Sequence, residues 1–168
     1  MKLSIIIPAF NEMNYLPKVI DECLEADLPS SITSREVTIV NDGSDDNSLE
    51  ILRQYNSSNI QIFHNEFQQG KSFSLKKGLE HATGDIILIQ DADFEYSPKE
   101  NFYNLLLPFV ENQGVKIIYG SRFLKRKWPI NMKISNLIAN YLLTWTVNLL
   151  YNGKITDETT CYKVFNAE

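Results

Sequence analysis

Three carboxylates follow a short apolar run near the middle of the chain, where residues 86–90 lead into Asp91, Asp93 and Glu95. In an extended segment, residues i and i+2 point the same way, so neighbouring carboxylates of this stretch would share one face. Like charges that close resist ionisation unless a cation lies between them, and carboxylate oxygens suit Mg²⁺ or Mn²⁺. Two interpretations fit: a divalent-metal site at the end of a strand, or an acidic turn in which Asp93 caps a neighbouring element.

The composition is that of a soluble globular protein. The 168 residues are enough for one domain, with 43% hydrophobic and 22% charged residues. The net charge of −5 argues against binding to nucleic acid. Cys23 and Cys161 have no zinc-site spacing, so we expect reduced thiols in a cytoplasmic protein. The chain lacks an uninterrupted apolar run of about eighteen residues, so no membrane-spanning helix is expected.

Strand and helix patterns alternate along the first two thirds of the chain. Apolar, β-branched runs predict strands at residues 2–8, 36–40, 60–64, 85–90 and 115–119. Helical periodicity and cap residues predict helices at residues 14–27, 48–55, 71–82 and 98–111. This alternation predicts an α/β fold with a mostly parallel sheet and helices on both of its faces.

In such sheets, ligands bind outside the carboxyl ends of the strands. Three polar clusters fall at predicted strand ends, namely residues 8–12, 41–46 and 91–95. Their convergence favours the metal-site interpretation of the acidic stretch over the acidic turn.

The segment Gly70-Lys71-Ser72 ends like a phosphate-binding P-loop, but that motif needs a glycine five positions earlier, where this chain has Asn65. We therefore exclude a P-loop. Gly70 and Lys71 still stand at a helix start, where backbone N–H groups and a lysine could meet an anion; an ordinary helix start is the alternative. Asp42 follows a strand and could accept hydrogen bonds from a nucleobase, or it could cap the helix at 48–55.

The chain changes in character after residue 121. A basic cluster comes first, made of Arg122, Lys125, Arg126 and Lys127, with Trp128 directly after it. Residues 131–151 then place apolar side chains on one helical face: Ile134, Leu137, Ile138, Tyr141, Leu142, Trp145 and Leu149. This pattern is typical of a helix that lies on a membrane surface, with the basic residues against anionic headgroups. An amphipathic core helix is the alternative, and the basic cluster and tryptophans favour the membrane surface.

Six motifs in chain order resemble the family 2 glycosyltransferases with the GT-A fold. They are IIIPAFNE (5–12), IVNDGSDDNS (39–48), GKSFSLKKGLEHATGD (70–85), QDADFEYSP (90–98), YGSRF (119–123) and ITDETTCYKVF (155–165). Within that family they are most similar to dolichol-phosphate mannosyltransferases and bacterial polyprenyl-phosphate glycosyltransferases. The resemblance implies a single Rossmann-like GT-A domain over residues 1–168. Residues 1–120 would bind the nucleotide sugar and residues 121–168 would face the acceptor.

The resemblance also implies roles for matching residues on the nucleotide side. Pro8, Phe10 and Glu12 match the loop that holds the nucleotide, although many relatives have a tyrosine where this chain has Phe10. Val40 and Asp42 match the positions beside the base and the ribose. The implied donor is a GDP- or UDP-hexose.

The remaining matches concern the phosphates and the sugar. Asp91, Ala92 and Asp93 match the motif that binds the donor diphosphate through Mg²⁺ or Mn²⁺. Glu95 stands where relatives place a further metal ligand, commonly a glutamine. The list of implied catalytic residues is Asp93, Arg122, which would meet a phosphate, and Asp157, which lies in a TD motif near the reacting sugar.

The expected reaction is the inverting transfer of a hexose from a nucleoside diphosphate to a polyprenyl phosphate. An ionised phosphate acceptor needs no strong general base; Asp157 would orient the donor, or act as the base if the acceptor were a sugar hydroxyl. Two alternatives are a transferase with a saccharide acceptor and a nucleotide-sugar-binding domain without turnover. Relatives continue past the position of Glu168, so we expect this chain to lack part of the acceptor side. The expected location is the cytoplasmic face of a membrane, as a peripheral protein.

Overall fold

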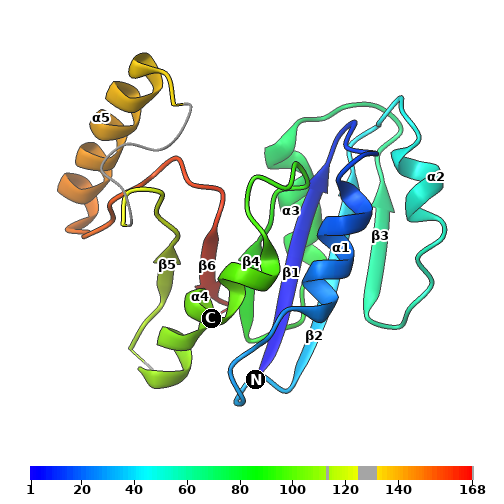
Figure 1. Ribbon diagram of the computed structural model, residues 1–168, viewed down its shortest axis with the longest axis horizontal. Helices are drawn as coiled ribbons and strands as arrows, with labels where there is room; N and C mark the ends of the chain where they lie inside the picture. Colours follow the sequence, from blue (N-terminus) through cyan, green and yellow to red (C-terminus); the bar gives the residue numbers. More distant parts are fainter. Residues whose placement is uncertain (113, 125–131, 168) are drawn as a thin grey trace.

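The computed structural model describes residues 1–112, 114–124 and 132–167. Its strands are β1 (Lys2–Ala9), β2 (Ser34–Asn41), β3 (Ile60–His64), β4 (Ile86–Ile89), β5 (Ile117–Tyr119) and β6 (Lys163–Asn166). They form one six-stranded sheet in the order β3-β2-β1-β4-β6-β5 (Figure 1). The β1–β4 part is parallel, with Ile5 paired to Val37 on one side and to Leu88 on the other. The predicted α/β fold with a mostly parallel sheet is confirmed.

Strand β6 was not predicted, and it makes the sheet mixed. It runs antiparallel to both neighbours, with Val164 opposite Leu88 of β4 and opposite Ile118 of β5. Because β6 lies between β4 and β5, the predicted strand at 115–119 joins the sheet only through it. The chain after α5 therefore returns into the sheet beside the strand that carries the acidic stretch.

In the part of the chain that the structure describes, five helices accompany the sheet: α1 (Leu16–Glu25), α2 (Ser48–Leu52), α3 (Lys71–His81), α4 (Pro98–Glu111) and α5 (Ile134–Tyr151). Helices α1 and α4 lie on one face of the sheet and α3 lies on the other, as predicted (Figure 1). Helix α5 stands apart at the β5 edge, beyond the helices that cover the sheet.

The main core lies between the sheet and α1 and α4. Because side chains alternate along a strand, Ile5 and Ile7 of β1 point into this core and Ile6 points to the opposite face, towards α3. Gly78 lets α3 approach β1 closely, since a Cβ there would lie 2.5 Å from the Ile6 side chain. Burial of the aliphatic side chains stabilises the arrangement by about 25 cal/mol for each Å² removed from water.

Helix α5 buries a polar stripe and exposes an apolar one. Its buried residues are Leu137, Asn140 and Thr144. Its exposed large apolar residues are Ile134, Ile138, Tyr141, Leu142, Leu143, Trp145, Leu149, Leu150 and Tyr151. The predicted apolar face is thus turned outward, except for Leu137, which the structure buries. Within the described ranges, no helix combines the length and apolarity that crossing a bilayer requires. The basic residues Lys125, Arg126 and Lys127, and Trp128, lie outside the described residues.

Candidate active site

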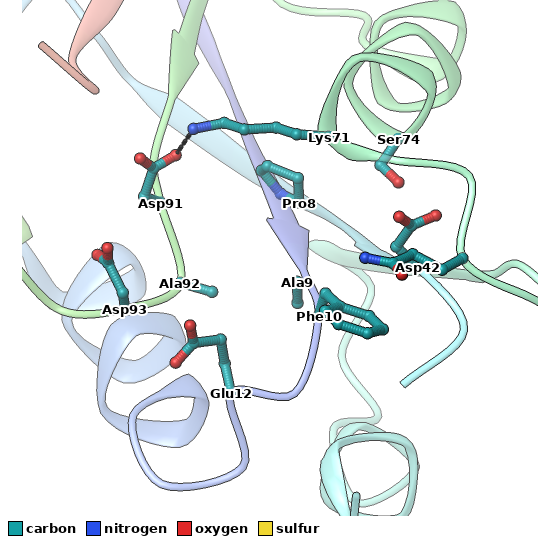
Figure 2. A pocket seen from close by; sticks show the side chains of 11 residues that line it. Pro8, Ala9, Phe10, Glu12, Asp42, Lys71, Ser74, Asp91, Ala92 and Asp93 are labelled. Carbon is teal, nitrogen blue, oxygen red and sulfur yellow. Dashed lines mark hydrogen bonds and ion pairs between the residues drawn. The ribbon is translucent and has the colours of Figure 1, made fainter. Parts of the chain in front are cut away.

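A cleft of about 260 Å³ opens at the carboxyl ends of β1, β2 and β4 (Figure 2). It is lined by Pro8, Ala9, Phe10, Glu12, Asp42, Gln68, Lys71, Ser74, Asp91, Ala92 and Asp93. The structure thus brings together most of the residues predicted for the nucleotide sugar. Val40 is fully buried in β2 and is not part of the lining, and Arg122 lies elsewhere. Gln68 and Ser74 were not predicted. Ser74 lies three residues after Lys71 on α3, and that helical spacing was the available signal.

Asp42 holds the loop that leads into α3. Its carboxylate accepts hydrogen bonds from Asn65 Nδ2 (2.7 Å), the Gln69 N–H (3.0 Å) and the Gly70 N–H (2.7 Å). Burial alone would raise the pKa of Asp42, but these hydrogen bonds favour the charged form and the net pKa is lowered. The carboxylate is therefore ionised and fixed at the wall of the cleft.

The alternative in which Asp42 caps α2 is wrong. The N-cap position is Asn47, and the Asp46 carboxylate before it accepts from the Ser48 N–H at 2.9 Å and from the Met13 N–H at 3.1 Å. The Ser48 hydroxyl in turn accepts from the Glu12 N–H at 3.1 Å. These contacts join the loop after β1 to the loop after β2, so both loops present their side chains to the same cleft.

The acidic stretch is a turn and not an extended segment. Strand β4 ends at Ile89, Phe94 has a φ of 57°, and Asp93 Oδ1 accepts from the Glu95 N–H at 3.1 Å. Gln90 closes the loop from inside, donating from Nε2 to the carbonyls of Asp91 (2.9 Å) and Tyr96 (3.5 Å). The expected alignment of three carboxylates fails because the backbone reverses before it reaches the third.

The predicted metal set of Asp91, Asp93 and Glu95 is not formed. Glu95 is exposed and does not line the cleft. Among the described residues, no group of three or more His, Cys, Asp or Glu side chains is arranged to hold a metal ion. Asp91 and Asp93 do line one cleft together with Glu12 (Figure 2).

The electrostatics of this cleft nevertheless fit a divalent cation. Burial raises the pKa of Glu12, and the negative charges of Asp93, Asp46 and Asp91 raise it further. Lys71 Nζ lies 2.5 Å from Asp91 Oδ1 and partly offsets this accumulation of negative charge. Carboxylate oxygens are the donors that Mg²⁺ and Mn²⁺ prefer. The residues therefore fit such an ion in kind and in charge, with Asp91 and Asp93 as the candidate ligands.

Arg122 and Asp157 form a bidentate pair beside β5. Asp157 is fully buried, and its carboxylate accepts from Arg122 Nε (2.7 Å), Arg122 Nη2 (2.8 Å), the Arg122 N–H (3.0 Å) and Asn140 Nδ2 (2.8 Å). Burial opposes ionisation of Asp157, yet the hydrogen bonds from Arg122 and Asn140 lower its pKa. The hydrogen bonds to Asp157 raise the pKa of Arg122. With four N–H donors around it, Asp157 holds Arg122 and is not free to accept a proton as a base.

The Arg122 region adjoins the acidic turn. Cys161 lies near Asp91, and burial, followed by the negative charge of Asp91, raises the pKa of its thiol to about 12. The Tyr162 hydroxyl donates to the Tyr96 carbonyl at 3.4 Å. Burial raises the pKa of the Tyr96 phenol, and the positive charge of nearby Arg122 offsets part of that rise. The two parts of the candidate site therefore meet at the loop after β4.

A model of glycosyl transferase family 2 matches residues 4–168, and the chain belongs to this family. One curated relative is "Dolichyl-phosphate beta-glucosyltransferase ALG5A" of Trichomonas vaginalis, 32% identical over 134 residues. The aligned part is 71% of this chain and 40% of that protein, so the chain spans less than half the length of this relative.

Two solved structures resemble the fold. Glucosyl-3-phosphoglycerate synthase from Mycobacterium tuberculosis, solved with Mn²⁺, UDP and phosphoglyceric acid, has a TM-score of 0.71 at 18% identity. The match covers 99% of this chain and 56% of that one. S. aureus TarS 1-349, solved with UDP-GlcNAc, has a TM-score of 0.59 at 25% identity and covers 74% of this chain and 38% of that one.

Proposed function

We propose that this chain transfers a hexose from a nucleoside-diphosphate sugar to a polyprenyl phosphate, with inversion at the anomeric carbon. The observation that carries the proposal is the cleft at the strand ends, which Asp91 and Asp93 line and in which Asp91 pairs with Lys71 at the start of α3. Membership of glycosyl transferase family 2 supports the reaction class. The relative named as a dolichyl-phosphate glucosyltransferase supports the lipid acceptor.

The donor would lie across the cleft. Its base would rest beside Phe10, in the cleft that Asp42 helps to line, and its diphosphate would reach the acidic turn. Asp91 and Asp93 would hold a Mg²⁺ or Mn²⁺ ion, which when bound neutralises charge on the leaving diphosphate. Lys71 and the backbone N–H groups at the start of α3 supply positive charge on the opposite wall.

The chemistry needs no strong base. A polyprenyl phosphate is largely ionised at neutral pH, because the second pKa of a phosphate monoester is about 6. One phosphate oxygen attacks the anomeric carbon while the bond from that carbon to the diphosphate breaks, and the bonding electrons leave with the diphosphate. Asp157 and Thr159 hold Arg122 through its Nε and Nη2 groups, so Arg122 would receive the acceptor phosphate with its Nη1 group and its positive charge.

The outer face of α5 supports a peripheral location at the cytoplasmic side of a membrane. The helix contains no charged residue, and Trp145 and Tyr151 are among its most exposed side chains. Lys133 precedes the helix and Lys154 follows it. Aromatic and aliphatic side chains with flanking cations fit the boundary between headgroups and acyl chains. The lipid phosphate acceptor would then reach the protein from the side on which α5 stands.

A transfer assay tests the proposal. The full chain is incubated with Mn²⁺, radiolabelled UDP- or GDP-hexoses, and either a polyprenyl phosphate in anionic vesicles or a soluble oligosaccharide. We expect label in the lipid fraction, as a product that mild acid releases. Label in the oligosaccharide alone would contradict a polyprenyl phosphate acceptor and indicate a saccharide acceptor. Donor binding by calorimetry with no product of either kind would leave a nucleotide-sugar-binding domain without turnover.

A further inference from the structure

The buried face of α5 contains two polar residues beside Leu137, and the hydrogen bonds of these two residues converge on one short segment. Asn140 and Thr144 are 2% and 8% exposed. Asn140 Nδ2 donates to Asp157 Oδ1 at 2.8 Å, and Asn140 Oδ1 accepts from the Thr159 N–H at 3.3 Å. Thr144 Oγ1 accepts from the Glu158 N–H at 3.0 Å and donates to Asn140 Oδ1 at 3.2 Å. The helix is thus attached to residues 157–159 by directional hydrogen bonds.

Such an interface differs from ordinary helix packing. A helix on a soluble domain usually buries its apolar stripe, which packs without strong directional preference. A buried amide or hydroxyl stabilises only when its hydrogen bonds are made, and each lost partner leaves a costly unsatisfied group. The polar stripe therefore fixes the rotation and height of α5 relative to residues 157–159 more sharply than aliphatic side chains would.

The same carboxylate binds α5 and Arg122. Asp157 Oδ1 accepts from both Asn140 Nδ2 and Arg122 Nη2, and Arg122 Nη2 also donates to the Thr159 hydroxyl at 2.6 Å. Two residues further on, Cys161 lies near enough to Asp91 of the acidic turn for the charge of that carboxylate to raise the pKa of its thiol, after the larger effect of burial. A shift of α5 along its axis would move Asp157, and with it the guanidinium, relative to the cleft.

We propose that Asn140 and Thr144 are positioning residues for the transfer reaction. They hold Asp157 and the backbone beside it, and through Asp157 they set the orientation in which Arg122 meets the acceptor phosphate. The outer face of α5 binds the lipid surface. Because the inner face holds Asp157, membrane binding by the helix fixes the position of Arg122 relative to the membrane. This inference rests on the proposed function, which assigns the acceptor phosphate to Arg122.

Two pairs of variants in the full chain test this role. Asn140→Ala and Thr144→Val remove the contacts. Asn136→Ala and Thr146→Val are matched controls, because both residues are exposed on the same helix, and the Thr146 hydroxyl donates only to the Leu142 carbonyl of its own helix. With Mn²⁺ and the donor at saturation, we expect kcat/KM for polyprenyl phosphate to fall about tenfold in the first pair, while KM for the nucleotide sugar stays within about twofold.

Thr144→Ser keeps the hydroxyl and is expected to restore kcat/KM, whereas an equal loss in the serine and valine variants would overturn the inference. An equal loss in the controls, or a parallel rise in KM for the nucleotide sugar, would also overturn it, since either result indicates general loosening. Thermal melting with bound nucleotide shows which variants are folded.

Failure of the proposed acceptor would be seen separately, as a wild-type chain that does not label polyprenyl phosphate. In that case amide hydrogen exchange tests whether Asn140 holds residues 157–159. Asn140→Ala is expected to speed exchange in residues 155–161 but not in α1, and Asn136→Ala is expected to leave both unchanged. Unchanged exchange at residues 155–161 would contradict the inference.

Discussion

Helices α1 and α5 distribute their side chains in opposite ways. Helix α1 buries Leu16, Val19, Ile20 and Cys23 against the sheet and exposes its charges. Helix α5 buries Asn140 and Thr144 beside Leu137, and exposes its tryptophan and its other leucines. The parallel part of the sheet, which we propose as the donor side, is therefore held by apolar burial against α1 and α4. The part that contains Arg122 and α5, which we propose as the acceptor side, is held by hydrogen bonds around the carboxylate of Asp157. The apolar side chains of α5 are exposed there, where a lipid surface could cover them.

Two aromatic residues give the largest expected contrast. Phe102 of α4 is fully buried, and Phe102→Ala is expected to lower the free energy of unfolding by about 3–5 kcal/mol. Trp145 of α5 is 64% exposed, and Trp145→Ala is expected to change it by less than about 0.5 kcal/mol while weakening flotation with anionic vesicles. Urea unfolding followed by circular dichroism measures both. A comparable destabilisation in the two variants would mean that the outer face of α5 is packed within the protein.

The acidic turn allows the donor side to be tested by its chemistry. Asp93→Ala is expected to reduce metal-dependent transfer on the order of 10³-fold, because charge neutralisation by a metal is worth several kcal/mol. Glu95→Ala is the matched control, since this exposed carboxylate lies outside the cleft, and we expect less than about threefold loss. Steady-state kinetics with titrated Mn²⁺ distinguish them. A large loss at Glu95 with none at Asp93 would reverse the assignment.

Glu36 of β2 shows that the donor side also contains a buried polar cluster. Burial would raise its pKa, but hydrogen bonds from Lys2, Ser4 and Thr83 lower it from 4.5 to about 2. Because the folded pKa is depressed, the stabilisation is present above pH 4.5 and is lost as the pH falls towards 2. At 1.36 kcal/mol per pH unit this amounts to about 3 kcal/mol.

Glu36→Gln should therefore flatten the dependence of the free energy of unfolding on pH between 4.5 and 2. Denaturant titrations of both proteins at several pH values in that window measure it. Curves that stay parallel would show that Glu36 ionises as easily in the folded protein as in the unfolded chain.

Arg122 gives the smallest expected effect and tests the acceptor side directly. Arg122→Lys should lower kcat/KM for polyprenyl phosphate about tenfold, because a lysine cannot make the two parallel hydrogen bonds to Asp157. Nucleotide affinity should not change. Arg53→Lys serves as the control, since Arg53 is exposed at the end of α2 and pairs only with Glu50 among the described residues. Equal kinetics in both variants would place Arg122 outside the acceptor site.

Local patterns were enough to predict the parallel part of the sheet and most of the cleft. The β-branched apolar run of β1 favours a buried strand, and parallel strands bring their carboxyl ends to one edge of the sheet. Phe10, Asp42 and Asp91 could therefore be placed together from the sequence.

The remaining features depend on contacts between distant residues. The turn after β4 requires Phe94 in a left-handed conformation, which its residue type does not favour. Asp42 finds its partners in the loop before α3, and Asn140 finds its partner in Asp157; neither pairing has a sequence signature. The asparagines of α5 looked like interruptions of an apolar face, whereas Asn140 lies at the centre of the buried interface.

The position of β6 sets an order of assembly. Among the described strands, β5 is joined to the rest of the sheet only by β6, and β6 is synthesised after both β5 and α5. A growing chain that has reached the end of α5 can form the parallel part of the sheet, but β5 has no strand to pair with. The pairing of Ile86 with Asn166 closes a long loop, which is a slow step in folding. Every residue that lines the cleft precedes β5 in the chain, so the cleft can form before β5 has a strand to pair with.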